Sequence, residues 1–233
     1  MKAHEVVTAW VTDRLRSGTL SVGDHLPSER TLAEELAVSR NSVREAMRIL
    51  EALGTIRTST GSGPTSGTII TAEPAQALTL ALNMQLATSQ VSHEHVYEMR
   101  LLLESWSASH ADPAYEDWPR VARILERMED PDLSTEQFLA LDAQFHVSLS
   151  HAAGNPLIST MMDALRTSIA DHTLERAHAL PDWQATADRL RAEHREIFEA
   201  FRTGDHAQSV EHTLAHIRGY YVETSAETSV GSP

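Results

Sequence analysis

Asp142 and His146 form the first pair of side chains whose types and spacing could do chemistry. They stand four residues apart in a stretch, 134–153, where apolar residues recur at helical spacing. Both fall at the edge of the apolar stripe that includes Phe138 and Phe145, and Asp142 lies almost inside it. A buried carboxylate without a partner is costly, so Asp142 needs a cation or a metal ion. Residues at this spacing share one helix face, so the pair can converge on one ion.

Two later histidines are further candidates. His194 falls in the middle of the apolar stripe of a predicted helix over 183–203. A histidine in that place can be a metal ligand or a hydrogen-bonded core residue. In the next predicted helix, 206–224, His216 lies roughly 120° from the centre of the apolar stripe. Helical spacing alone therefore leaves the roles of both histidines open.

The composition limits the chemistry that is available. The 233-residue chain contains no cysteine, so a metal site must use histidine and carboxylate ligands. No apolar run reaches the roughly 18 residues that a membrane helix needs. The first residues also lack the hydrophobic region and cleavage site of a signal peptide. We therefore expect a cytoplasmic protein with no membrane partner.

Acidic residues are concentrated in the later part of the chain. The formal net charge is -14, yet residues 1–72 hold eight basic and eight acidic side chains. The remaining residues hold 11 of the 19 basic side chains and 25 of the 33 acidic ones. Because an acidic surface repels nucleic acid, only the first segment could face phosphates comfortably.

Three helices and two short strands are expected in the first domain, residues 1–72. Apolar spacing predicts a helix over 3–16, a second from Ser28 to about Ala37, and a third after Ser39. Ser39 suits the N-cap of that third helix. The segments TIRTS and SGTIIT flank a loop of Gly, Ser and Pro and predict two strands. This order is typical of a helix-turn-helix with a β wing.

From residue 73 onward the pattern is helical, with no strand signal. The predicted helices cover 74–89, 92–110, 117–129, 134–153, 156–178, 183–203 and 206–224. Seven such helices predict an antiparallel bundle over residues 73–225. The fold class is therefore mostly α, with a winged helix-turn-helix before an all-α bundle. The tail, 226–233, is expected to be disordered.

The third predicted helix has the character of a DNA-recognition helix. Arg40 and Arg44 lie near its N-terminal end, where they could reach guanine edges or phosphates. Ser39 and Asn41 add short hydrogen-bonding groups, and Arg30 in the preceding helix could reach the DNA backbone. The alternative is that these arginines solvate the helix face and pair with neighbouring glutamates.

The stretch LPSERTLAEELAVSRNSVREAMRILEALGTI resembles, almost position by position, the winged helix-turn-helix of the GntR family of bacterial transcription regulators. The resemblance implies DNA contacts by Arg30, Arg40 and Arg44, with Gly63 or its neighbours at the wing tip. The wing TSTGSGPTSGTII is longer than the usual compact turn of the family. It also has no basic residue after Arg57.

The later segment is similar to the FadR subfamily, whose helical effector-binding domain is called FCD. The motifs VYEMRLLLE, LDAQFHVSLSHAAGN, EHREIFEAFRTGD and LAHI carry this similarity. Many members bind a divalent metal through one Asp and three His. The resemblance assigns these ligands to Asp142, His146, His194 and His216. Such a set suits Zn²⁺, Ni²⁺, Mn²⁺ or Fe²⁺.

The resemblance also implies an effector pocket. Arg100 resembles the pocket arginine of the family and would form a bidentate pair with an effector carboxylate. Its alternative role is an internal salt bridge to Glu98 or Glu104. Arg166 and Trp183 are further candidates to line the pocket.

These features together predict a homodimeric transcription regulator that binds double-stranded operator DNA. A small carboxylate at the metal would control this binding, and most relatives repress, so we expect a repressor. One alternative is a metal-dependent enzyme acting on a small hydroxy acid, because a metal with an open position can activate water. A missing general base and the DNA-binding segment count against it. The other alternative is a regulator whose metal only clamps the bundle.

Overall fold

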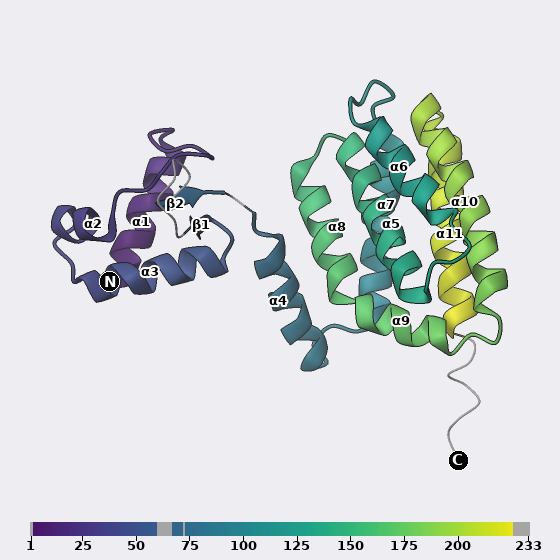
Figure 1. Cartoon of the computed structure of the whole chain (residues 1–233), viewed down its shortest axis with the longest axis horizontal. Coiled ribbons are helices and arrows are strands. Elements are labelled where there is room, and N and C mark those ends of the chain that lie inside the picture. The colour runs from purple at the N-terminus through teal and green to yellow at the C-terminus, as the bar shows by residue number, and fades with distance from the viewer. Residues whose placement is uncertain (1, 60–66, 72, 226–233) are drawn as a thin grey trace, which may run out of the picture. The chain divides into compact units, whose positions relative to one another are not determined.

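The computed structural model describes residues 2–59, 67–71 and 73–225. The chain divides into two compact units, Met1–Leu78 and Thr79–Pro233 (Figure 1). Each unit has its own hydrophobic core. The predicted tail, 226–233, and the wing residue Gly63 lie outside the described residues.

The first unit contains three helices and a two-stranded sheet. Its elements are α1 (Ala3–Arg16), α2 (Glu29–Glu35), α3 (Arg40–Ala52), β1 (Ile56–Ser59) and β2 (Gly67–Ile70). The strands pair antiparallel, with Ile56 opposite Ile70, and both of these side chains are buried. They join Val7, Leu32 and Val43 in one core, so the sheet closes over the three helices. This arrangement confirms the predicted winged helix-turn-helix.

Local sequence features determine where these helices begin and where the chain turns. Ser28 caps α2 by accepting a hydrogen bond from the backbone N–H of Thr31. Ser39 caps α3 in the same way, as its place in the sequence predicted. Gly54 follows α3 with φ near 67°, and a Cβ atom there would lie 2.0 Å from the carbonyl oxygen of Glu73. Only glycine fits this approach of two backbone segments.

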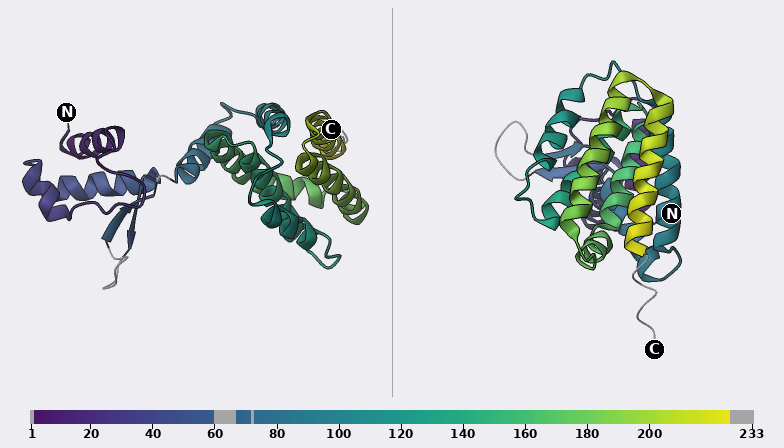
Figure 2. Two further views of the ribbon diagram at one scale, coloured as in Figure 1. Left: turned by 90° about the horizontal axis from the view of Figure 1, so that it is seen from above. Right: turned by 90° about the vertical axis from the view of Figure 1, so that its right-hand side faces the viewer.

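The second unit is a bundle of α-helices. The helix α4 (Ala75–Ala87) spans the boundary between the units. The others are α5 (His93–His110), α6 (Trp118–Met128), α7 (Thr135–Ala152), α8 (Pro156–Ser168), α9 (Ala170–His178), α10 (Trp183–Thr203) and α11 (His206–Ser225). The long helices lie side by side, with α5 against α11 and α7 against both α6 and α8 (Figure 2). The predicted helical bundle is confirmed.

One helix prediction is wrong. The stretch 156–178 forms two helices, because the chain leaves the α-helical conformation at Ile169, where φ is -108° and ψ is 5°. Just before this break, the hydroxyl group of Ser168 donates a hydrogen bond to the carbonyl oxygen of Leu165. Serine side chains compete in this way with the backbone hydrogen bonds of a helix. The break lets α9 take a new direction below α8 (Figure 1).

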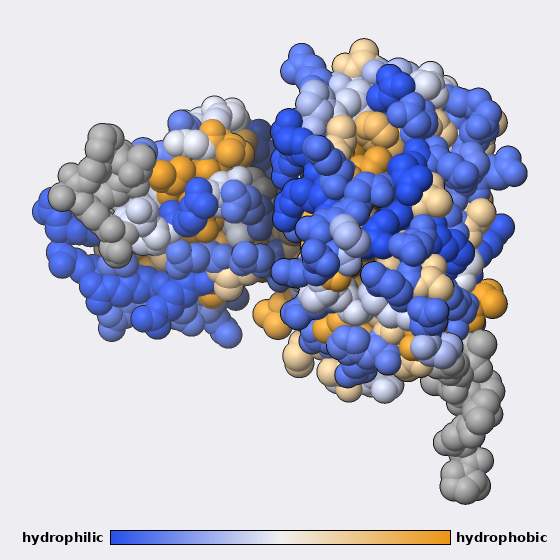
Figure 3. Space-filling view, turned by 45° about the vertical axis from the view of Figure 1, so that its right-hand side comes forward, coloured by the Kyte–Doolittle hydropathy of each residue, from blue (hydrophilic) through white to orange (hydrophobic). Residues whose placement is uncertain are grey.

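Aromatic and aliphatic side chains fill the bundle core. Phe138 and Phe145 from α7 meet Ile197 and Phe201 from α10, and all four are almost fully buried. The face shown in Figure 3 is largely hydrophilic over the bundle, with scattered apolar side chains. No helix in the described part of the chain is long and apolar enough to cross a membrane.

Candidate metal centre and DNA-binding surface

Four side chains from three helices converge inside the bundle. Asp142 and His146 come from α7, His194 from α10 and His216 from α11. Each offers one ligand atom, and these atoms all lie within 4.8 Å of one another. All four residues are buried, with His194 fully inaccessible to solvent. The structure therefore brings together every residue of the predicted metal-ligand set in a group that could hold one ion.

The inward position of His216 has a reason that helical spacing of apolar residues could not reveal. The buried residues of α11 are Ser209, Thr213, His216, Ile217 and Thr224. Four of these five are polar, so an apolar stripe drawn through the helix misses the face that is buried. The hydroxyl groups of Ser209 and Thr213 are small enough to be covered beside the core, which leaves room for an imidazole.

Two carboxylates orient the histidine rings. Nδ1 of His146 lies 2.6 Å from Oε2 of Glu104, and Nδ1 of His216 lies 2.7 Å from Oε2 of Glu193. A carboxylate accepts a hydrogen bond, so each Nδ1 carries the proton and each Nε2 presents a lone pair. Histidines that bind metals typically donate their other ring N–H to such a partner.

With the proton on Nδ1 in each ring, the Nε2 atoms of His146 and His216 carry no proton and face each other. Nε2 of His146 and Nε2 of His216 are 3.2 Å apart. The ring nitrogens of His194 have no hydrogen-bond partner of acceptable geometry, although its Nε2 lies 3.0 Å from Oδ1 of Asp142. A cation placed among these atoms would satisfy lone pairs that the protein alone leaves facing one another. The residues present therefore fit a divalent metal.

Sequence reasoning missed Glu104 and Glu193 as supporting groups. Glu104 entered only as a salt-bridge partner of Arg100, and its place in the motif LLLE gives no sign of burial. Glu193 directly precedes His194 but contacts His216, a residue of another helix. Its role depends on how α10 packs against α11, which no local pattern encodes.

Burial keeps His194 and His216 in the neutral form that can bind a metal. It lowers the pKa of His194, an effect that Asp142 only partly opposes. Burial, together with the nearby His194, lowers the pKa of His216 to about 3. Burial alone would raise the pKa of Asp142, but Arg166 and His146 outweigh it and hold that pKa well below the usual range. Neutral imidazoles and an ionised carboxylate are the ligand forms.

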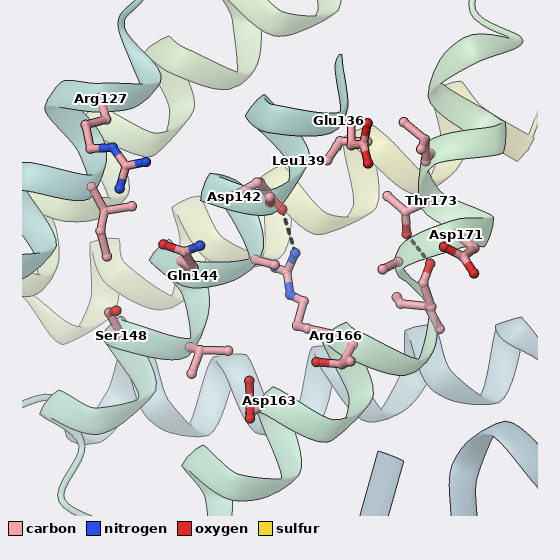
Figure 4. Close-up of a pocket in the computed structure, with 18 of the residues that line it drawn as sticks. Arg127, Glu136, Leu139, Asp142, Gln144, Ser148, Asp163, Arg166, Asp171 and Thr173 are labelled. Carbon is pink, nitrogen blue, oxygen red and sulfur yellow. Dashed lines mark hydrogen bonds and ion pairs between the residues drawn. The ribbon is translucent and has the colours of Figure 1, made fainter. Parts of the chain in front are cut away.

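Two of the predicted effector-binding arginines border this group. The guanidinium group of Arg166 donates to Oδ2 of Asp142 at 2.6 Å (Figure 4) and to Oε1 of Glu104 at 3.3 Å. Arg100 donates to the same Glu104 oxygen at 2.9 Å. The salt bridge to Glu104 that the sequence offered as an alternative for Arg100 is thus present. Arg166 thus contacts the candidate ligand Asp142 directly, and Arg100 is linked to the candidate ligand His146 through Glu104.

The third predicted effector residue, Trp183, lies elsewhere. It stands at the beginning of α10, and its ring packs edge-on against Phe138 with 5.6 Å between the ring centroids. Phe138 separates it from His194, because the Phe138 ring packs against both residues. The structure does not bring Trp183 to the four candidate ligands.

Two cavities lie beside the arginines that border the group. The larger, of about 900 Å³, lies among α6, α7, α8 and α9 and has Asp142 and Arg166 in its wall (Figure 4). The smaller, of about 190 Å³, lies among α5, α9 and α11 and has Arg100 and Tyr220 in its wall. The hydroxyl oxygen of Tyr220 is buried without a hydrogen-bond partner among the described residues.

The candidate DNA-binding residues lie on the surface of the first unit. Arg30, Ser39, Arg40, Asn41 and Arg44 are all exposed. The opposite face of α3 is buried in the core of this unit, so the helix presents its polar face outward. This is the geometry that a recognition helix needs.

Two of these arginines form exposed ion pairs. Nε of Arg44 lies 2.8 Å from a carboxylate oxygen of Glu29, and Arg30 lies 3.8 Å from Glu34. Arg44 therefore reaches across to α2, where the sequence suggested a partner within its own helix. Exposed pairs of this kind are weak, and a phosphate group could displace the carboxylates.

Comparison with known proteins agrees with this two-part organisation. Residues 3–65 match the bacterial regulatory proteins of the gntR family, and residues 95–219 match the FCD domain. The chain is 30% identical over 206 residues to the HTH-type transcriptional regulator LutR of Bacillus subtilis, covering 87% of this chain and 92% of that protein. It is 27% identical over 219 residues to a regulatory protein of the L-lactate dehydrogenase operon in Escherichia coli, covering 89% and 82%.

The fold also has a solved counterpart. The structure of Streptococcus agalactiae GntR aligns with a TM-score of 0.65 at 24% identity, covering 94% of this chain and 98% of that chain. A winged helix-turn-helix followed by an FCD bundle defines a class of DNA-binding regulators. This chain belongs to the GntR family of transcription regulators, in the group that carries an FCD domain. It is a transcription regulator and not an enzyme.

Proposed function

We propose that this regulator binds a divalent metal ion, one of Zn²⁺, Ni²⁺, Mn²⁺ or Fe²⁺, through Asp142, His146, His194 and His216. The observation that carries the proposal is the pair of inward-facing Nε2 atoms of His146 and His216, 3.2 Å apart and held by carboxylates at Nδ1. Two unprotonated nitrogens that face each other in a buried site cost free energy unless a cation lies between them.

The proposed effector is a small carboxylate that reaches the metal-ligand group. A bound metal would supply open coordination positions to a carboxylate or hydroxy acid. Arg100 and Arg166 each hold a carboxylate of the protein in a buried salt bridge. An effector carboxylate would compete for these guanidinium groups and so change the contacts among α5, α7 and α8. The relatives named for lactate genes favour a ligand of the lactate type.

The DNA-binding step is assigned to α3 and its surroundings. Arg40, Arg44, Asn41 and Ser39 would contact the major groove, and Arg30 the DNA backbone. A homodimer would place two such helices on the two halves of a pseudo-palindromic operator. Effector binding that favours a state with low DNA affinity would release the operator, which is the behaviour of a repressor.

Mobility shift on DNA tests the proposal. The full-length protein, loaded with Zn²⁺, is first used to select binding sites from random-sequence DNA. Addition of L-lactate should then weaken binding to the selected operator, and His194→Ala should abolish this response because the metal no longer binds. His212→Ala is the matched control, since His212 is a partly exposed residue that pairs with Glu196.

The possible outcomes separate the parts of the proposal. A lactate response that persists in His194→Ala would show that the metal is not needed. Metal binding without an effect of any small carboxylate would instead support the purely structural metal. Absence of sequence preference in the selection would exclude the operator-binding role altogether.

A further inference from the structure

The cavity among α6, α7, α8 and α9 has the features of a second ligand site. Its volume, about 900 Å³, is ample for a small metabolite. Figure 4 shows Arg127 on one side of it, Asp171 and Thr173 on the other, and Arg166 between them. The two sides therefore differ in charge.

The α6 side is basic. Arg120, Arg123 and Arg127 follow one another at spacings of three and four residues, so they share one exposed helix face, and all three line the cavity. Arg120 has a distant partner in Asp117, at 3.8 Å. This concentration of basic side chains is unusual, because residues 73–233 hold 11 basic and 25 acidic side chains in all.

Two of these arginines also differ from the other basic residues of the bundle. Across residues 79–225, most arginines form an ion pair or a hydrogen bond to the protein. Arg123, Arg127 and Arg218 have neither. Two of these three unpaired guanidinium groups line the same cavity, although exposed carboxylates are abundant in this unit. Unpaired cations at a cavity wall are available to bind an anionic ligand.

The opposite side is acidic and rich in hydrogen-bonding groups. Asp171 and Thr173 on α9 lie there, whereas Asp163 on α8 lies below Arg166 and Gln144 on α7 lies nearer the basic side (Figure 4). No ion pair links Asp163 or Asp171 to the α6 arginines among the described residues. Carboxylates at a distance from the basic side repel an anion but accept hydrogen bonds from hydroxyl groups. The cavity thus offers cations on one side and acceptors on the other.

The wall between the two sides contains a buried cation with an unused hydrogen-bond donor. Arg166 is 7% exposed, and its Nε has no partner among the described residues. Its Nη1 is held by Oδ2 of Asp142, whose other oxygen faces His194. A buried N–H group without an acceptor is costly, so a ligand atom that reached Nε would remove that cost.

We propose that this cavity binds a sugar phosphate, with the phosphate against Arg123 and Arg127 and the sugar hydroxyls against Asp163 and Asp171. A phosphate satisfies two guanidinium groups at once, and a polyol supplies the donors that the acidic side accepts. The site is additional to the proposed effector site at the metal. It shares Asp142 with the metal-ligand group and Arg166 with the proposed effector site, so occupancy would also affect the metal.

Calorimetric titration of the full-length Zn²⁺-loaded protein tests the site. The probes are glucose 6-phosphate, inorganic phosphate and glucose. We expect glucose 6-phosphate to bind at least about tenfold more tightly than inorganic phosphate, and glucose to show no binding. Arg123→Gln with Arg127→Gln should weaken glucose 6-phosphate binding by about tenfold or more. Arg218→Gln removes the third unpaired arginine and should leave the affinity unchanged.

Two further variants separate the new site from the metal and from general phosphate binding. His194→Ala should lose the metal yet keep glucose 6-phosphate binding, even if the lactate response of the proposed function is absent. Asp163→Asn with Asp171→Asn should reduce the preference for glucose 6-phosphate over inorganic phosphate. No binding of glucose 6-phosphate, equal affinity for the two phosphates, or binding unaffected by the Arg123 and Arg127 changes would overturn the proposal.

Discussion

Arginine is used in opposite ways in the two units of this protein. In the winged unit, Arg30, Arg40 and Arg44 are exposed, and the ion pairs that two of them form involve glutamates at the surface. In the bundle, Arg166 is buried and its partners Asp142 and Glu104 are buried as well. Exposed pairs exchange easily with a charged partner, whereas buried pairs hold a unique internal arrangement. Exposed pairs therefore suit DNA contact, and buried pairs suit a ligand site that must be preformed.

The largest effect is expected from breaking the buried network. In the metal-free protein, Arg166→Leu leaves Asp142 and Glu104 without a major cationic partner. We expect the free energy of unfolding of the bundle to fall by about 3–5 kcal/mol. The matched change in the winged unit, Arg44→Leu, removes an exposed pair and should cost less than about 1 kcal/mol. Urea denaturation followed by circular dichroism measures both, and equal losses would contradict the contrast between the units.

For DNA affinity, a change in the winged unit should have the larger effect and a change in the bundle the smaller. Arg40→Ala removes an exposed guanidinium group at the start of α3, and we expect operator affinity to fall by about 1–3 kcal/mol. If Arg40 contacts a phosphate, the dependence of binding on salt concentration should also become shallower. Arg202→Ala, an exposed arginine of the bundle that pairs with Glu199, should change neither quantity. Fluorescence anisotropy at several salt concentrations distinguishes these results.

A pH dependence of the free energy of unfolding should arise from the buried imidazole of His216. The pKa of His216 is lowered to about 3 by burial and by His194, whereas an unfolded histidine titrates near 6.5. The unfolded chain therefore takes up a proton first as the pH falls, so the stability that neutral His216 contributes is complete above pH 6.5. Between pH 6.5 and 5, the metal-free protein should lose about 2 kcal/mol from this group. His216→Asn should flatten the curve in that range.

The sequence predicted the surface of this molecule better than its interior. The N-cap at Ser39 and the exposed arginines of α3 follow from local rules, because solvent-facing positions depend on few neighbours. The buried position of His216 and the break at Ile169 did not, because each depends on polar groups that tertiary packing covers. The four candidate ligands were assigned through motif resemblance, because helical spacing placed only Asp142, His146 and His194 in or beside an apolar stripe and left the role of His194 open.

Glu193 offers a finer test of what burial adds to a histidine–carboxylate pair. The two pairs Glu193–His216 and Glu196–His212 both join α10 to α11, but the first is 2.7 Å long with a buried imidazole, and the second is 3.5 Å long with both partners exposed to solvent in part. Because the carboxylate of Glu193 fixes the tautomer that presents Nε2, Glu193→Gln should weaken Zn²⁺ binding by about tenfold. Glu196→Gln should leave it unchanged, since His212 lies outside the ligand group. Competition with a chelating dye measures both affinities. A similar loss in the two variants would mean that overall charge, and not orientation of His216, controls the metal affinity.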